Sequence, residues 1–132
     1  MNEIPIELTM LLGATILYVA QILIAAQMAY IQNGVAWSLG NREQIPVLPG
    51  FGGRAQRAYK NMTENLLPFA CLVLIAHGTG RLGELSALGA EIFLISRVFY
   101  ALLYMAGIKV LRSLAYFGGL IGMVLIGIQI LS

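Results

Sequence analysis

A run of polar side chains inside an otherwise apolar segment is the part of this sequence that could do chemistry. Arg54, Arg57, Asn61 and Glu64 are separated by three, four and three residues within "GRAQRAYKNMTENLLPF". On an α-helix this spacing places all four on one face. Glu64 lies roughly 10 Å along the helix axis from Arg57. An ionisable group at that depth in a membrane costs roughly 3 kcal/mol unless it is paired or faces water, so we expect the face to contact protein or ligand.

Two later segments also carry an arginine and one or two tyrosines three or four residues apart, a spacing that places the arginine and tyrosines of each segment on one helical face. The first carries Arg97, Tyr100 and Tyr104, and the second carries Arg112, Ser113 and Tyr116. Arg97 lies roughly 13 Å from the loop that follows its segment, so it also needs a partner inside the membrane. Glu64 is the candidate partner, because a short loop joins the two segments that carry these residues.

The collected side chains indicate which kind of ligand could bind. Several fixed cations, phenols and one amide favour an anion, and one carboxylate could meet an ammonium group. A small zwitterionic peptide with extra carboxylates fits this set. A metal ion does not fit, because carboxylates are few and the single histidine, His77, lies at the far end of its segment.

The composition indicates a membrane protein with one domain. Of the 132 residues, 59% are hydrophobic and 11% are charged, whereas soluble domains average about 45–50% and about 25%. Because a transmembrane helix needs roughly 20 mostly apolar residues, we expect four spans. The single domain, 1–132, would hold them at about 8–31, 57–77, 85–106 and 112–131. One long loop, 32–53, and two short loops would make them an all-α antiparallel four-helix bundle.

Charge and cysteine content exclude other classes. The net charge of +2 is too small to indicate nucleic-acid binding. The single cysteine, Cys71, can form neither a disulfide within the chain nor a CxxC motif. The start "MNEIPIE" is acidic, whereas signal peptides begin with positive charge, so we expect no cleavable leader.

The basic residues predict the orientation of the bundle. They gather in or beside the first and third loops, as Arg42, Arg54, Arg57, Lys60, Lys109 and Arg112, whereas the opposite side carries Arg81. The positive-inside rule then places these loops in the cytoplasm and both termini outside. We expect a multi-pass protein of a bacterial inner membrane, with the polar site toward the cytoplasm.

Three of the segments resemble the MAPEG family, the membrane-associated proteins in eicosanoid and glutathione metabolism. "RAQRAYKNMTENLLPF" resembles the family pattern R-x-x-R-A-x-x-N-x-x-E-x-x-x-P-F of the second span. "RVFYALLY" is similar to the third-span R-x-x-[HY]-x-x-x-Y, and "LRSLAY" is similar to the start of the fourth span. The resemblance implies a microsomal glutathione transferase-like homotrimer of four-helix bundles, with glutathione bound between subunits in the cytoplasmic half of the membrane.

The resemblance also implies a role for each polar residue. Arg57, Asn61 and Glu64 would hold the peptide, with Glu64 at its ammonium group. Arg54 and Lys60 would add positive charge at the mouth of the binding site. Its wall would be completed by Arg97, Tyr100 and Tyr104. Arg112 would face the sulfur, with Ser113 and Tyr116 beside it; Arg112 and Tyr116 are the expected catalytic residues. Glutathione would be a co-substrate, no metal would be needed, and the acceptor would be a lipophilic electrophile or a lipid hydroperoxide.

The chemistry of a thiol supports the role given to Arg112. A free thiol has a pKa of roughly 8.5, so only a few per cent is thiolate at neutral pH. A guanidinium stays charged and lowers the pKa of a nearby thiol, and a drop of one unit corresponds to about 1.4 kcal/mol. The thiolate could then attack an electrophile dissolved in the bilayer, for conjugation, peroxide reduction or isomerisation.

Other interpretations of the same residues remain open at this stage. The basic residues could be positive-inside charges that contact lipid phosphates, and Glu64 with Arg97 could be a purely structural pair. A small proton-coupled exporter could use Glu64 as its carrier. A third alternative is a catalytically silent protein that has kept the fold.

Overall fold

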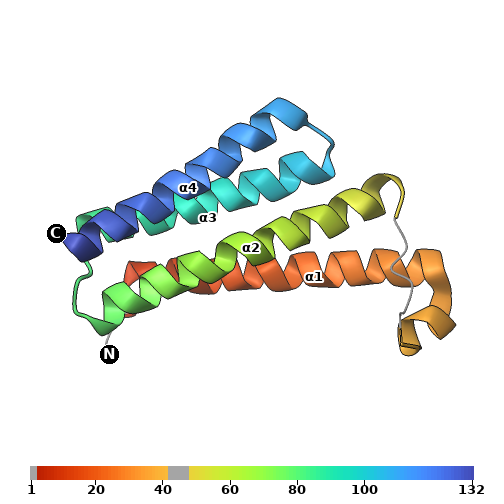
Figure 1. The fold of residues 1–132 in the computed structure, drawn as a ribbon, viewed down its shortest axis with the longest axis horizontal. Helices are drawn as coiled ribbons and strands as arrows, with labels where there is room; N and C mark the ends of the chain where they lie inside the picture. Colours follow the sequence, from red (N-terminus) through yellow and green to blue (C-terminus); the bar gives the residue numbers. More distant parts are fainter. Residues whose placement is uncertain (1–2, 42–47) are drawn as a thin grey trace.

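The computed structural model describes residues 3–41 and 48–132, and the regular elements in these ranges are four helices. They are α1 (Ile6–Leu39), α2 (Gly50–Gly78), α3 (Glu84–Met105) and α4 (Lys109–Leu131). Successive helices run in opposite directions, and both chain ends lie at the same end of the bundle (Figure 1). The predicted all-α antiparallel four-helix bundle is confirmed.

The helices extend further than the predicted spans. Residues 32–39 and 50–53, which we expected in a loop, are helical. Gly34 interrupts α1 with φ 85° and ψ 174°, a backbone conformation that glycine adopts without steric cost. The helix resumes after it, and Ser38 Oγ donates to the Gly34 carbonyl oxygen at 3.1 Å. Arg42, counted among the basic residues of this loop, lies outside the described residues.

Three helices of the described ranges, α1, α3 and α4, are long and apolar enough to cross a membrane. α2 has 29 residues and is long enough to cross a membrane. Its first half is not uniformly apolar, because it carries the charged residues Arg54, Arg57, Lys60 and Glu64. Its second half, 66–76, is apolar apart from Pro68 and Cys71. Large apolar side chains remain exposed along all four helices, as expected where lipid replaces water as the solvent.

Small residues allow α3 and α4 to pack closely. A Cβ added to Gly89 would overlap the Gly122 carbonyl oxygen, and a Cβ on Gly122 would overlap that of Gly89. One turn away, a Cβ on Gly118 would lie 2.5 Å from Ser96 Oγ. This is the small-residue packing that membrane helices use. It fixes the register in which the start of α4 lies beside the end of α3.

An aromatic stack fixes the register between α2 and α3. The rings of Phe69 and Phe93 are parallel within 9°, with centroids 3.8 Å apart, and both side chains are completely buried. Met62 and Ala14 belong to the same core. Because α2 and α3 are antiparallel, the turns of α2 before Phe69 face the turns of α3 after Phe93. These are the turns that carry the polar residues.

Polar contacts join the helices at the end that holds the chain termini. The buried Ser86 hydroxyl donates to the carboxylate of Glu7, which links α3 to α1. The Leu85 N–H donates to Gln129 Oε1 at 3.2 Å, which links α3 to α4. These contacts hold α3 against α1 and α4 at this end of the bundle.

Candidate functional site

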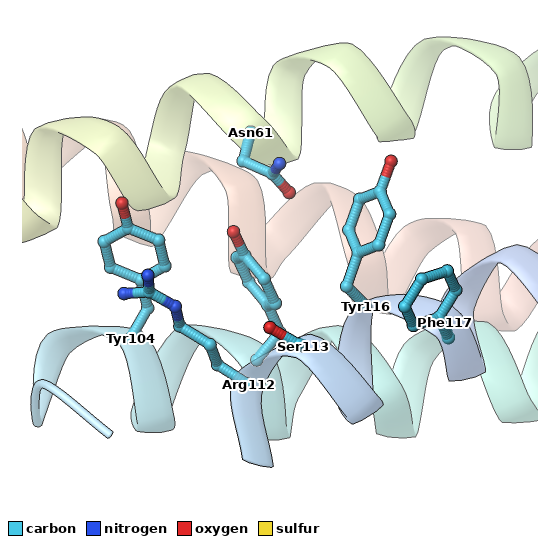
Figure 2. A pocket seen from close by; sticks show the side chains of 7 residues that line it. Asn61, Tyr104, Arg112, Ser113, Tyr116 and Phe117 are labelled. Atoms are coloured by element: carbon cyan, nitrogen blue, oxygen red, sulfur yellow. The ribbon is translucent and has the colours of Figure 1, made fainter. Parts of the chain in front are cut away.

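A cavity of about 350 Å³ lies between α2, α3 and α4, toward the end of the bundle opposite the chain termini. Its lining residues come from all three helices: Asn61 from α2, Tyr100 and Tyr104 from α3, and Arg112, Ser113, Tyr116 and Phe117 from α4 (Figure 2). The volume falls within the range of about 300–1,000 Å³ that is usual for small-molecule sites. The structure thus brings six of the residues singled out in the sequence to one cavity.

Three phenol rings form one wall of the cavity. The ring centroid of Tyr100 lies 5.6 Å from that of Tyr104 and 6.2 Å from that of Tyr116. The hydroxyl groups of Tyr104 and Tyr116 point toward α2 (Figure 2). Phe117 extends the wall and is 58% exposed. We did not select Phe117 from the sequence, because only its position directly after Tyr116 pointed to it.

Two arginines from different helices contact Tyr104. The guanidinium carbon of Arg112 lies 4.2 Å from the centroid of the Tyr104 ring, a distance typical of a cation–π contact. Arg57 Nε donates a hydrogen bond to the Tyr104 hydroxyl oxygen at 3.2 Å. Arg112 lines the cavity, whereas Arg57 lies beyond the ring that lines it. The positive charge is therefore concentrated around one phenol.

Asn61 is held in place by a neighbouring amide that we did not select from the sequence. Asn65 Nδ2 donates to the Asn61 carbonyl oxygen at 2.8 Å and to Asn61 Oδ1 at 3.3 Å. Asn65 is only 7% exposed. The contact with Asn61 Oδ1 uses one of its two lone pairs and orients the amide, which can still accept from and donate to a ligand. The spacing of four residues between two amides was the available sequence signal.

Arg54 contacts the backbone at the end of α3 and does not line the cavity. Its Nε donates to the Met105 carbonyl oxygen at 2.9 Å. The last carbonyl groups of a helix lack partners within the helix, and this contact satisfies one of them. Gly107, with φ 82°, turns the chain directly beside the Arg54 side chain. Arg54 thus supports the short turn that leads to Arg112.

Arg97 lies behind the cavity wall instead of lining it. The side chain is 1% exposed, and its guanidinium carbon lies 4.2 Å from the Tyr100 ring centroid. None of its three nitrogen atoms has a hydrogen-bond partner among the described residues. The expected ion pair with Glu64 was therefore wrong. Asn65, the next residue along α2, is the one turned inward, and Glu64 is exposed.

Lys60 and Glu64 both lie outside the cavity. They are four residues apart on α2, so they share a helix face, and both are exposed on the surface of the bundle. The predicted polar face is therefore wider than the surface that meets α3 and α4. Asn61 lines the cavity, whereas Glu64 on the same face is exposed.

The charges around the cavity have one sign. Arg112 lines it, and Arg57 and Arg97 each lie against one of its phenol rings. No carboxylate is present among its lining residues in the described part of the chain. The NH₂ group of Asn61 can donate a hydrogen bond, whereas the Ser113 hydroxyl donates to the Lys109 carbonyl oxygen at 3.3 Å and can accept one. This arrangement can bind an anion and stabilise negative charge beside Arg112.

The fold and cavity define a class: a four-helix membrane protein with a cavity between its helices that is lined by phenols and an arginine. Residues 8–132 match the family model described as the MAPEG family. The chain therefore belongs to the MAPEG family and is an integral membrane protein. This family includes glutathione transferases and related membrane proteins. Comparison with curated proteins and with solved structures gave no match.

Proposed function

We propose that the protein is a glutathione-dependent membrane transferase, with peroxidase activity on lipid hydroperoxides as a second use of the same site. The observation that carries this proposal is the cavity in which Arg112 lies beside three phenols and an amide from three helices. Glutathione has two carboxylates, one ammonium group and a thiol, and such a ligand matches a cationic cavity with amide and hydroxyl donors. Family membership supports the same ligand.

In the proposed reaction, Arg112 stabilises the glutathione thiolate. The thiol proton passes to solvent, and the guanidinium compensates the charge left on sulfur. The sulfur lone pair then forms a bond to the electrophilic carbon, and the leaving group departs with its electron pair. With a hydroperoxide, the thiolate takes the terminal oxygen and releases the lipid alcohol after protonation. A second glutathione then gives the disulfide and water.

Tyr116 and Ser113 lie on the same side of the cavity as Arg112. The Tyr116 hydroxyl can donate to the thiolate or to the leaving group, which is the catalytic role we propose for it. Asn61, Ser113, Tyr100 and Tyr104 would contact the peptide. The half-exposed Phe117 offers the lipophilic acceptor an apolar approach from the membrane.

The exposed charges on α2 support a homotrimer in which neighbouring subunits complete the site. Lys60 and Glu64 are exposed on a single subunit at a depth where lipid contact is costly. A neighbouring subunit would cover them, and Glu64 would then reach the ammonium group of glutathione. Arg97 would contribute positive potential from behind Tyr100, and Arg54 and Arg57 would do so from the mouth.

The distribution of basic residues supports a cytoplasmic site. Arg54, Arg57, Lys109 and Arg112 lie at the end of the bundle opposite the termini. By the positive-inside rule this end faces the cytoplasm, where glutathione is available, and the termini face outward. We propose a bacterial inner membrane and a role in detoxification. Glu64 is exposed on the outside of the four-helix bundle. A proton carrier inside a single four-helix bundle would need its carboxylate in the bundle interior, so this position argues against a proton-coupled exporter.

The test is glutathione binding and turnover by the purified protein in detergent. Calorimetry should detect glutathione binding. Turnover should be seen with a small aromatic halide or with a lipid hydroperoxide, while S-methylglutathione should bind without reacting. A protein that does not bind glutathione would refute the proposal. Binding without turnover on a broad panel of electrophiles would favour the catalytically silent alternative.

A further inference from the structure

Tyr104 is contacted on two sides by cations from two other helices. Arg112 of α4 lies over its ring, with the guanidinium carbon 4.2 Å from the centroid. Arg57 of α2 donates to its hydroxyl oxygen at 3.2 Å. The phenol therefore separates two guanidinium groups that would repel each other at shorter range, and it links α2 to α4 through α3.

The ring contact is what orients Arg112. Within residues 3–41 and 48–132, no hydrogen bond or ion pair holds the Arg112 guanidinium. An arginine side chain has many rotamers, and fixing them has an entropic cost. A cation–π contact offsets part of this cost and defines the plane in which the guanidinium lies. Loss of the ring would leave the charge free to move away from the cavity.

The hydroxyl contact in turn fixes the ring. Tyr104 lies near the end of α3, one residue before Met105, where the chain turns toward α4. Its hydroxyl points toward α2 (Figure 2), and Arg57 meets it there. Arg54 holds the following carbonyl group. The two arginines of α2 therefore both act on the end of α3.

We infer that Tyr104 is a positioning residue: its ring holds the Arg112 guanidinium at the cavity, and Arg57 fixes that ring through the hydroxyl. The inference rests on the proposed function, because Arg112 must stabilise a thiolate for its position to matter. It assigns Arg57 an action through Tyr104 in addition to any contact with the ligand. It also explains why a cation on α2 can influence chemistry at the start of α4.

The experiment measures the pKa of bound glutathione from the ultraviolet absorbance of the thiolate as pH is varied. The full-length protein in detergent is compared with Tyr104→Leu, which removes the ring, and Tyr104→Phe, which removes only the hydroxyl. We expect Tyr104→Leu to raise the thiol pKa by about one unit. Tyr104→Phe should raise it by less. Lys109→Gln, which removes an exposed charge from the same turn, is the control and should leave the pKa unchanged.

A double-mutant cycle tests the part played by Arg57. If Arg57 acts through Tyr104, Arg57→Gln should shift the thiol pKa more in the parent protein than in the Tyr104→Phe background. An equal shift in both backgrounds would mean that Arg57 acts on the ligand directly, and that half of the inference would be wrong. The cycle does not need Tyr104→Leu, so it decides the question even if that variant does not fold.

The outcomes separate the inference from the proposed function. If the parent protein neither binds nor ionises glutathione, both fail. If the parent ionises glutathione and Tyr104→Leu has the same thiol pKa, only the inference fails. A lower pKa in Tyr104→Leu would also overturn it, because the ring would then be holding Arg112 away from the sulfur. Weaker glutathione binding with an unchanged pKa would identify Tyr104 as a ligand contact only.

Discussion

Replacing Arg112 by Gln should raise the pKa of bound glutathione and slow the chemical step. Arg112 Cζ lies in van der Waals contact with the Tyr104 ring at 4.2 Å. A sulfur atom on the cavity side of the guanidinium would lie at a similar distance. Gln keeps a hydrogen-bonding amide, two bonds shorter than the guanidinium, and removes the charge, so the change tests the electrostatic contribution of Arg112.

The size of the effect follows from this distance. Opposite unit charges about 4 Å apart attract by about 1 kcal/mol at the dielectric constant of water and by about 4 kcal/mol at an effective value of about 20. One pKa unit corresponds to about 1.4 kcal/mol, so the two limits are about 0.7 and about 3 units. Arg112 is half-buried. We therefore expect a rise of about 1–2 units, toward the free-thiol value of about 8.5.

Thiolate absorbance of the glutathione complex against pH measures this shift, and the rate of conjugation at fixed pH should fall in parallel. If the pKa rises by about 1–2 units to about 8.5, the thiolate fraction at pH 7 falls by about eightfold to about 25-fold. Lys109→Gln removes the same charge three residues earlier from an exposed position and should have no effect. If Arg112→Gln and the parent protein gave the same thiol pKa, the proposed role of Arg112 would be refuted.

Three further predictions concern the supports of the site. Gly122→Ala should lower the free energy of unfolding by about 1–3 kcal/mol, because its Cβ would overlap the α3 backbone. The control Gly127→Ala should be neutral, because its Cβ would meet no atom within 4 Å, and equal melting temperatures for the two variants would contradict the packing argument. Arg54→Gln should increase hydrogen exchange at residues 105–108, because the Met105 carbonyl loses its donor; unchanged exchange would remove this role. Asn65→Ala should raise the KM for glutathione more than it changes kcat, because Asn65 orients the Asn61 amide that we expect to bind glutathione. A change in kcat alone would contradict this role of Asn65.

The sequence was sufficient to predict the architecture because the relevant signals are local. Apolar length gives the helices, and short loops make neighbouring helices antiparallel. The three- and four-residue spacings also placed Asn61, Tyr100, Tyr104 and Tyr116 on the inner faces that meet in the cavity. For a helix, the face shared by residues follows directly from their spacing, so such sets can be recognised without coordinates.

The partners of the charged residues could not be predicted in the same way. Spacing alone left Glu64 on the same broad face as Asn61, and the resulting pairing with Arg97 was wrong. The inward direction of α2 is set by the stack of Phe69 on Phe93, a contact between residues that spacing does not relate. That stack turns Asn65 inward and leaves Glu64 exposed.

The role of Arg54 depends on a similar long-range contact. The family resemblance suggested a charge at the mouth of a binding site. In the fold, it meets a carbonyl group at the end of another helix, 51 residues away in the chain. Which backbone carbonyl lacks a partner is known only once the end of α3 and its neighbour are placed. Sequence patterns identify the cation but not the acceptor.

The most direct test of the central claim is an experimental structure of the protein in complex with glutathione. The account predicts glutathione density in the cavity between α2, α3 and α4, with the sulfur as the ligand atom nearest to Arg112 and the peptide beside Asn61. Glutathione bound at another surface, or bound in the cavity with its sulfur remote from Arg112, would contradict it.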